Sequence, residues 1–510
     1  MKKTYGVCFG MLAMGFAIGG APASKAQNRM AADGTGGGSE SSTAIASASP
    51  AMSSPTDLDR RIEALETELS ELRTELAAKR DAEPVSTVVA TSAVAAQDKP
   101  VEKTTIAGLL GPTSVSGFVD VYYQVNFNHP NQATPNFYPG ADFRVYDFRS
   151  QSISLNMAEL ILDKAPAADS AIGRTGYHVS VGFGDGMNVT NSFDPAGLGF
   201  AQYLKEGYVS YLAPLGKGLQ VDFGKFVTPM GAEVIESKDN WNYSRSILFG
   251  YAIPFYHFGV RAKYAFNDKY SLTGFVTNGW NNVVDNNSGK TYGFSFAGTP
   301  TKQWSYYVNY LAGPETPAGT FGFTTAAHTV PATVNSVWRQ TWDATLMYTP
   351  TSRWSFTLNY DYGRGDRTVT NFATNPNTLS PPVYWTGFAG YVKYSPDAND
   401  YFAGRYEYYN DHDGFTTTSS IPGIFGSGGP ASFIPSTSFN ASGNLKKPHY
   451  NEFTLTYQRT LASYLLARFE YRRDSSQFPV YAISTFGPGV KSQNTFTMGL
   501  ILLFDSRNAK

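Results

Sequence analysis

The chain has 510 residues, of which 42% are hydrophobic, 15% aromatic and 16% charged, and its formal net charge is −1. Soluble domains carry about 25% charged residues, so this surface needs fewer charges than water demands. A balance this close to neutrality argues against nucleic acid as a partner, because binding a polyanion requires a basic surface.

Residues 1–26 have the pattern of a secretory signal peptide. Lys2 and Lys3 precede an apolar stretch at 7–18 that is too short to span a bilayer, and small residues predict cleavage near Ala26. The single cysteine, Cys8, lies in this stretch, so we expect a mature chain with no disulfide and no thiolate metal site.

The next segments predict a helix between two linkers. Residues 27–56, rich in Ala, Ser, Thr and Gly, and the polar stretch 81–114 are expected to be flexible. Residues 57–80 predict a short self-associating coiled coil, and a single amphipathic helix is the alternative. The heptad seam is formed by Leu58, Ile62, Leu65, Leu69, Leu72 and Leu76.

Residues 256–280 show the unit that fills the rest of the chain. Apolar and polar side chains alternate along 256–266, the chain turns at 267–269, and the alternation resumes at 270. This pattern predicts a β-hairpin with one apolar face. Its recurrence with short turns on one side and long polar loops on the other indicates an all-β fold, a transmembrane antiparallel β-barrel over 115–510. Strands are predicted at 115–127, 150–163, 176–184, 203–212, 218–227, 256–266, 270–280, 290–299, 303–312, 337–349, 353–363, 383–394, 400–410, 450–458, 463–473 and 493–504.

The strand count of about sixteen leaves fourteen as an alternative. Tight turns are expected at 214–218, 267–269, 300–302, 350–352, 396–399 and 459–461, whereas the connection at 164–175 is longer than the alternation requires. Aromatic residues just before these turns predict a ring of side chains at one bilayer interface. They are Tyr211, Phe266, Tyr348, Tyr394 and Tyr457.

Two stretches carry a family resemblance, GKFVTPMGAE at 224–233 and ESKDNWNYSR at 236–245. Together with SLNMAEL at 154–160 and TNGWNNVVDN at 277–286, they resemble the OmpL-like β-barrel porins of Gram-negative outer membranes. The resemblance covers about 115–504. It implies a porin in the outer membrane and supplies no substrate.

The loop at 228–255 is the candidate constriction. It is the third long loop, and in general porins, by analogy, that loop folds inward. Opposed charges across a narrow aqueous passage would orient dipolar solutes, whereas the alternative is an ordinary charged surface loop. The candidate residues are Glu233, Glu236, Lys238, Asp239 and Arg245.

Charges at every second position of several strands are expected to face the lumen. An Arg or Lys facing lipid near the midplane would cost about 2–4 kcal/mol. The set could form an ion-selecting wall with a slight preference for anions, or a solvated face without preference. Its members are Arg261, Lys263, Arg339, Asp343, Arg405, Glu407, Arg468, Glu470 and Arg472.

An enzyme is not expected, and neither catalytic residues, cofactor nor metal ligands are predicted. Six histidines are scattered without metal-ligand spacing, and Asp411-His412-Asp413 is interpreted as loop polarity rather than a cation site. The leading hypothesis is a homotrimeric outer-membrane channel for passive diffusion of small hydrophilic solutes or ions, surrounded by lipid. The alternative is a structural or adhesive barrel with a plugged lumen.

Overall fold

The computed structural model describes residues 111, 113–130, 144–192, 201–315, 338–365, 382–418, 446–483 and 489–506. These residues form sixteen strands and four short helices. The strands are β1 (Ser114–Asn126), β2 (Ile153–Lys164), β3 (Thr175–Phe183), β4 (Leu204–Ala213), β5 (Leu219–Val227), β6 (Tyr256–Ala265), β7 (Tyr270–Thr277), β8 (Thr291–Gly298), β9 (Trp304–Pro314), β10 (Trp338–Tyr348), β11 (Trp354–Gly365), β12 (Val383–Tyr394), β13 (Asp400–Asn410), β14 (His449–Ala462), β15 (Leu465–Ser476) and β16 (Ser492–Asp505). The helices are α3 (Asp185–Asn191), the 3-10 helix η1 (Ser237–Asp239), α5 (Ile247–Tyr251) and α6 (Phe415–Thr418).

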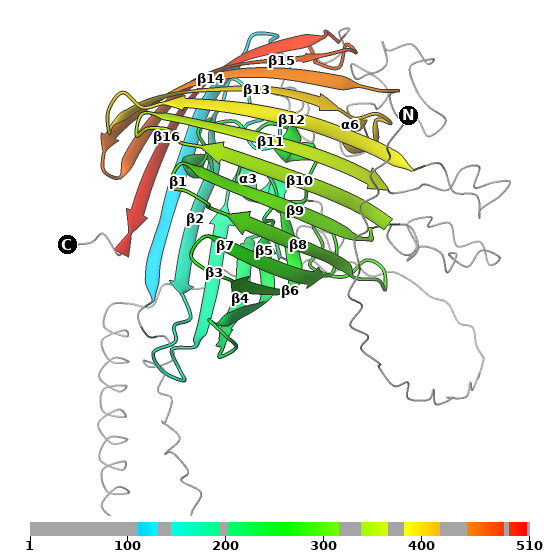
Figure 1. Ribbon diagram of the computed structural model, residues 1–510. Coiled ribbons are helices and arrows are strands. Elements are labelled where there is room, and N and C mark those ends of the chain that lie inside the picture. The colour runs from blue at the N-terminus through cyan, green and yellow to red at the C-terminus, as the bar shows by residue number, and fades with distance from the viewer. Residues whose placement is uncertain are drawn as a thin grey trace, which may run out of the picture. The chain divides into compact units, whose positions relative to one another are not determined.

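All sixteen strands pair in one closed antiparallel barrel (Figure 1). Each strand lies beside its sequence neighbours, and the ring closes where β16 pairs with β1, with Ser116 opposite Asp505 and Asn126 opposite Thr495. The predicted all-β fold and its sixteen strands are therefore confirmed, and a count of fourteen is excluded. Among the helices of the described ranges, none is both long enough and apolar enough to cross a membrane.

Two connections depart from the regular series of tight turns. The chain between β2 and β3 forms a longer loop, as the sequence indicated. The tight turn predicted at 459–461 is wrong, because β14 continues to Ala462 and the turn lies at Ser463 and Tyr464. The pairing register shifts between Thr460 and Ala462, and this irregularity lets the strand continue past the predicted turn.

The strands direct apolar side chains outward and polar ones inward. On β10, Trp342 and Leu346 are 43% and 42% exposed, whereas the intervening Asp343 and Thr345 are 1% and 3% exposed. Successive side chains of a strand point to opposite faces of the sheet. The apolar face therefore lies on the outside of the barrel, where hydrocarbon would cover it.

Aromatic rings gather near the tight turns. Tyr348 stacks on Trp304 with ring centroids 4.2 Å apart, and the rings of Tyr394 and Trp354 are 4.7 Å apart. Both pairs join register partners on neighbouring strands. Amphipathic rings at one height of a barrel suit the boundary between hydrocarbon and headgroups.

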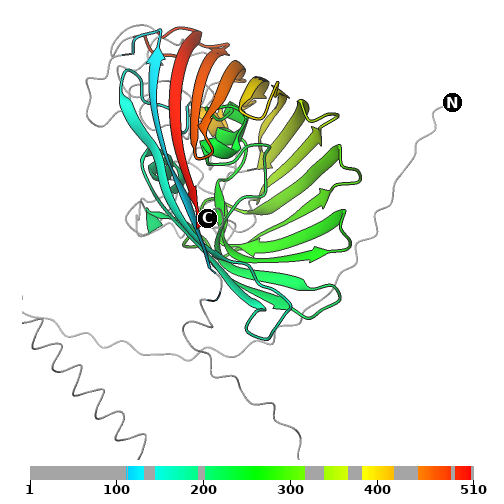
Figure 2. The ribbon, with the colours of Figure 1, turned by 90° about the vertical axis from the view of Figure 1, so that its left-hand side faces the viewer.

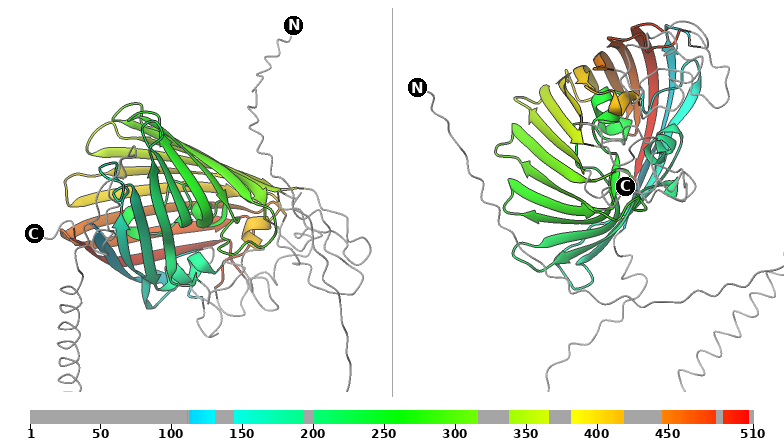
Figure 3. Two further views of the ribbon diagram at one scale, coloured as in Figure 1. Left: turned by 90° about the horizontal axis from the view of Figure 1, so that it is seen from below. Right: turned by 90° about the vertical axis from the view of Figure 1, so that its right-hand side faces the viewer.

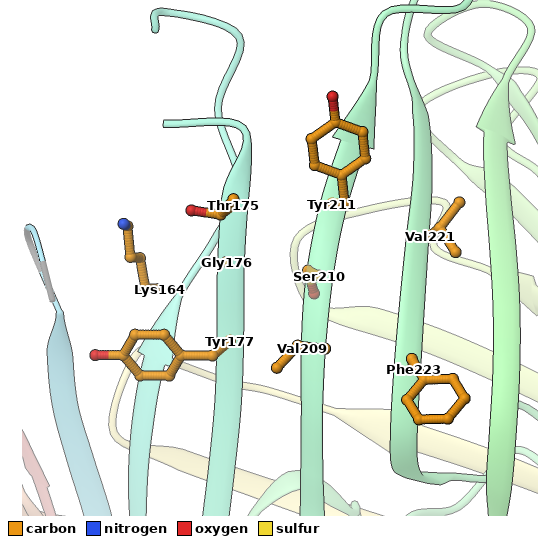
Figure 4. A pocket seen from close by; sticks show the side chains of 9 residues that line it. All are labelled: Lys164, Thr175, Gly176, Tyr177, Val209, Ser210, Tyr211, Val221 and Phe223. Atoms are coloured by element: carbon orange, nitrogen blue, oxygen red, sulfur yellow. The ribbon is translucent and has the colours of Figure 1, made fainter. Parts of the chain in front are cut away.

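A hollow of about 680 Å³ lies against β3, β4 and β5 (Figure 4). Val209 and Phe223, which line it, are 62% and 57% exposed and belong to the outward face of their strands. The hollow therefore faces the lipid side of the barrel and is not part of a channel.

The predicted signal peptide and coiled coil lie outside the described residues, and so do the linkers up to residue 110. Their boundaries, and the start of the barrel domain at 115, stay predictions.

Candidate functional site

The connection between β5 and β6, residues 228–255, enters the barrel and is called the inner loop below. The green segment that carries α5 lies within the ring of strands in Figures 2 and 3. Tyr243, Ile247 and Leu248 are fully buried there, in a core cluster with wall residues such as Trp385 of β12. Since β5 and β6 pair with each other, the loop leaves and rejoins the wall at one place.

A wall carboxylate fixes α5. Glu407 of β13 accepts hydrogen bonds from the backbone N–H groups of Ile247 (2.7 Å) and Leu248 (2.9 Å). Ser246 caps the helix, and its hydroxyl oxygen accepts from the N–H of Phe249 (2.9 Å). The first N–H groups of a helix have no partners within it, so a carboxylate there satisfies them directly.

A second wall carboxylate holds the segment before α5. Glu470 of β15 accepts hydrogen bonds from the N–H groups of Tyr243 (2.6 Å) and Ser244 (3.0 Å), and from the hydroxyl of Thr456 (2.7 Å). Both Glu407 and Glu470 thus bind consecutive backbone N–H groups of the inner loop. These bonds depend on the path of the loop and not on its side chains.

Two arginines of β15 bind the carbonyl groups of the same segment. Arg468 donates to the carbonyl oxygens of Asn240 (2.8 Å) and Lys238 (3.2 Å), and Arg472 donates to that of Arg245 (2.5 Å). A guanidinium offers five N–H donors in a fixed plane, which suits several carbonyls at once. Carboxylates and arginines of one wall therefore bind both kinds of backbone group.

Arg405 of β13 is the centre of a buried ion-pair network. Its guanidinium contacts Glu233 of the inner loop (2.5 Å) and Glu452 of β14 (2.8 Å), and donates to the carbonyl oxygen of Ser244 (2.7 Å). Glu233 also accepts from the N–H of Ser246 (2.7 Å). Buried charges persist only when paired and hydrogen-bonded, so these residues stabilise the inner loop together.

Glycines in the wall make room for the inner loop. A Cβ atom on Gly499 of β16 would lie 2.6 Å from the ring of Tyr243, and one on Gly387 of β12 would lie 2.7 Å from the side chain of Leu248. The hydroxyl of Tyr243 donates to Asp120 of β1 (2.9 Å). Burial raises the pKa of Tyr243 well above its ordinary value, so the hydroxyl keeps its proton for this bond.

The first part of the inner loop binds a different wall. The N–H of Ala232 donates to the side-chain oxygen of Asn359 (3.1 Å) on β11, and the amide of Asn309 on β9 donates to the carbonyl oxygen of Pro229 (3.1 Å). Asp343 of β10 accepts from both amides, at 2.5 Å from Asn309 and 2.6 Å from Asn359. The inner loop is therefore attached on two sides.

The predicted constriction charges occupy different environments. Glu233 and Arg245 are buried, at 5% and 3% exposure, and Glu236 forms an ion pair with Lys205 of β4. Only Lys238 and Asp239 keep substantial side-chain exposure, at 22% and 53%.

The predicted wall charges also divide into two groups. Arg405, Glu407, Arg468, Glu470 and Arg472 are buried between the inner loop and the wall, at 0–2% exposure. Arg339 lies over the ring of Trp280 at 4.7 Å, and Asp343 is buried on β10.

Arg261 and Lys263 of β6 keep contact with solvent. The Arg261 side chain is 24% exposed, pairs with Asp222 (2.8 Å) and lies 4.7 Å from the ring of Tyr208. Lys263, two residues further along the same face, is exposed.

Several residues of this network were not predicted from the sequence. Glu452 faces Glu407 in the register, and Asp474 lies two residues after Arg472, 2.7 Å from its guanidinium. Extending the alternation of charges along β14 and β15 would have found both. Arg144, which reaches Asp474 (3.3 Å) from the first long loop, gives no such signal in the sequence.

The described residues contain no group of three or more His, Cys, Asp or Glu side chains arranged to hold a metal. Within the motif at 411–413, Asp411 accepts hydrogen bonds from the N–H groups of Phe415 (3.0 Å) and Thr417 (2.8 Å). This carboxylate therefore stabilises the turn of α6.

Comparison with known proteins identifies a family. The model of the family described as "Putative beta-barrel porin-2, OmpL-like" matches residues 112–504. No curated protein matches the chain.

Solved barrels are similar at low identity. The loop L8 deletion mutant of OmpT from Vibrio cholerae is 11% identical, with a TM-score of 0.45, over 77% of this chain and 99% of that one. The outer membrane channel DcaP of Acinetobacter baumannii is 9% identical, with a TM-score of 0.46, over 77% and 97%. An anion-selective porin from Comamonas acidovorans is 10% identical, with a TM-score of 0.41, over 77% and 99%.

Proposed function

Because the chain belongs to the family described as "Putative beta-barrel porin-2, OmpL-like", it is an outer-membrane porin, and we propose that it forms a water-filled channel for the passive diffusion of small hydrophilic solutes or ions. One observation carries this proposal. The inner loop buries the inward charges of β13 and β15, whereas Arg261 and Lys263 of β6 keep their exposure. A passage would therefore run between the inner loop and the wall beside β6, next to the ion pair that joins Glu236 of the loop to Lys205 of β4.

The charged side chains beside this passage are positive overall. Arg261 and Lys263 contribute two positive groups, and Asp222 compensates one of them. Lys238 and Asp239 of the inner loop lie instead beside β1 and β16, where Lys238 is 5.4 Å from the ring of Phe118, and their charges balance each other. The net positive charge of this set favours anions, because fixed charges attract counter-ions most where water is least able to screen them.

A plugged structural or adhesive barrel is the second candidate. The attachment of the inner loop to both the β9–β11 wall and the β13–β15 wall favours it, because a loop held on two sides can close a lumen. The two candidates differ in conductance, since only an open passage carries ions.

Export and assembly complete the proposal. The signal peptide would direct export of the chain and be removed by cleavage near Ala26, before the barrel inserts into the outer membrane. The helices at 57–80 would then associate three barrels as a homotrimer. Short helices associate weakly alone, but tethering to barrels that meet in one membrane raises their effective concentration. A variant with both Leu65→Asp and Leu69→Asp should then have a lower trimer fraction in mild detergent.

Planar-bilayer recording of the purified protein tests the channel. Stepwise current increases after addition of the folded protein are the expected result, and heat-denatured protein should give none. Protein that inserts into lipid vesicles but passes neither ions nor small sugars would contradict the channel and favour the plugged barrel.

A further inference from the structure

His178 of β3 lies between two carboxylates in the wall of the barrel. Its Nδ1 atom is 2.9 Å from a carboxylate oxygen of Asp163 on β2, and its Nε2 atom is 3.4 Å from one of Glu206 on β4. Asp163 is also the register partner of His178. One imidazole thus contacts acidic side chains of both neighbouring strands.

This contact belongs to a row of side chains that reaches β6. The imidazole of His178 stacks on the ring of Tyr208 with ring centroids 5.2 Å apart, and the guanidinium of Arg261 lies 4.7 Å from the same ring. Tyr208 precedes the outward-facing Val209, so it points inward, because successive side chains of a strand alternate between faces. His178 and Arg261 therefore lie on the same inward face, beside the proposed passage.

Water of the lumen reaches this row. The side chain of Asp163 is 40% exposed, and those of His178 and Glu206 are 16% and 11% exposed. In contrast, the paired side chains of Arg405 and Glu452 behind the inner loop are 0% exposed. A proton can therefore pass between His178 and the lumen, and the charge of His178 acts on ions that pass there.

The geometry around His178 suits its charged form. A neutral imidazole has one N–H group and one bare nitrogen, so it donates to one carboxylate and turns a lone pair toward the other. An imidazolium has an N–H group on each nitrogen and suits both carboxylates. Lys205, the neighbour of Glu206 in the sequence, pairs with Glu159 (2.6 Å) and Glu236.

We propose that His178 makes the ion preference of the channel depend on pH, an inference that rests on the proposed channel function. While the imidazole is neutral, Asp163 and Glu206 oppose the positive charges of Arg261 and Lys263. Protonation of His178 compensates one of these two carboxylates. The preference for anions should therefore increase as the pH falls, because a fixed charge in a narrow passage repels ions of its own sign.

Reversal potentials of the full-length protein in planar bilayers under a KCl gradient test the proposal. Histidine ordinarily changes its charge between about pH 5 and pH 8, so the wild-type value should shift toward anions from the upper to the lower end of this range. His178→Gln should keep the high-pH value throughout. His178→Lys, which carries a permanent charge, should keep the low-pH value.

His412→Gln is the matched control. His412 also lies beside a carboxylate, that of Asp413 (3.3 Å), but it follows the end of β13 and is not part of the inward row. This variant should show the same pH dependence as the wild type. If His178→Gln does not fold, the loss of pH dependence in His178→Lys carries the same test.

A second measurement needs no current. In protein with isotope-labelled histidine in detergent, the NMR signal that is lost in His178→Gln should change with pH over the same range. A titrating signal in a protein that passes no current would contradict the channel function. A conducting protein whose reversal potential does not depend on pH, or shifts equally in His178→Gln, would overturn the role of His178 alone. A His178 signal that does not change with pH would overturn it as well.

Discussion

The carboxylate of Glu470 accepts a hydrogen bond of 2.6 Å from the backbone N–H of Tyr243, and this bond joins the barrel wall to the inner loop. Both residues are almost fully buried, at 1% and 0% exposure. A hydrogen bond to an ionised acceptor is stronger than a neutral one, and more so away from water. The position of the inner loop therefore depends on a few wall side chains.

Replacing this acceptor should loosen the inner loop. Glu470→Ala leaves the N–H groups of Tyr243 and Ser244 without an acceptor, at a cost of about 1–3 kcal/mol for each buried donor. We expect a noisier open-channel current in planar bilayers. Asp268→Ala, in the exposed turn between β6 and β7, is the control and should record like wild type. Equal noise in both variants would mean that Glu470 does not hold the loop.

Arg405 should matter far more to stability than an exposed arginine. Arg405→Met leaves Glu233 buried without the arginine it pairs with, and leaves Glu452 with the more distant Arg472 (3.7 Å). We expect this to cost about 3–5 kcal/mol of unfolding free energy. Adding Glu233→Gln and Glu452→Gln should recover part of this loss. Arg459→Met, which removes an arginine with a 55% exposed side chain, should change little. Circular dichroism during denaturation in detergent measures all three, and equal losses at the two arginines would contradict the network.

Gly499 should be intolerant of a side chain. Gly499→Leu pushes the ring of Tyr243 away from Asp120, and overpacking of this kind costs about 1–3 kcal/mol. Gly390→Leu on β12 is the matched control, because a Cβ there meets nothing within 4 Å. Thermal unfolding should separate the two variants. If the two unfold together, Tyr243 does not pack against β16 as described.

The exposed charges on the inward face of β6 should set the ion preference of the channel. Lys263→Glu reverses an exposed charge on the inward face of β6, so the reversal potential under a KCl gradient should shift toward cations. Lys269→Glu makes the same change in the tight turn after β6 and should shift it much less. Arg245 suits this test poorly, because its guanidinium is buried and bonded to the carbonyl oxygen of Tyr243 (2.9 Å). Equal shifts would place the selective region outside the β6 wall.

Most of the fold was predictable from local patterns. Alternation along each strand and polar residues between strands are local signals, and they placed all sixteen strands within a few residues. The turn at 459–461 failed because a register shift at Thr460 has no clear signal in one sequence. The inward set, including Arg405 and Glu470, was also found from alternation.

The partners of these residues were not predictable. Whether an inward arginine faces water or a loop depends on contacts between segments far apart in the chain, such as Arg468 with Asn240. The charges of Glu233 and Arg245 suggested that the loop lines a polar passage. Both residues are instead buried, and Glu233 pairs with Arg405 of the wall. The alternation along a strand does not show which loop residue such a wall residue contacts.

Single-channel conductance of a variant that lacks residues 236–246 tests most directly whether the inner loop sets the width of the channel. The deletion removes the segment bound by Glu470, Arg468 and Arg472 and leaves these side chains facing an enlarged lumen. The account predicts a measurable conductance for wild type and a larger one for the deletion, with both proteins inserted at equal levels. Equal conductance in the two proteins would contradict it.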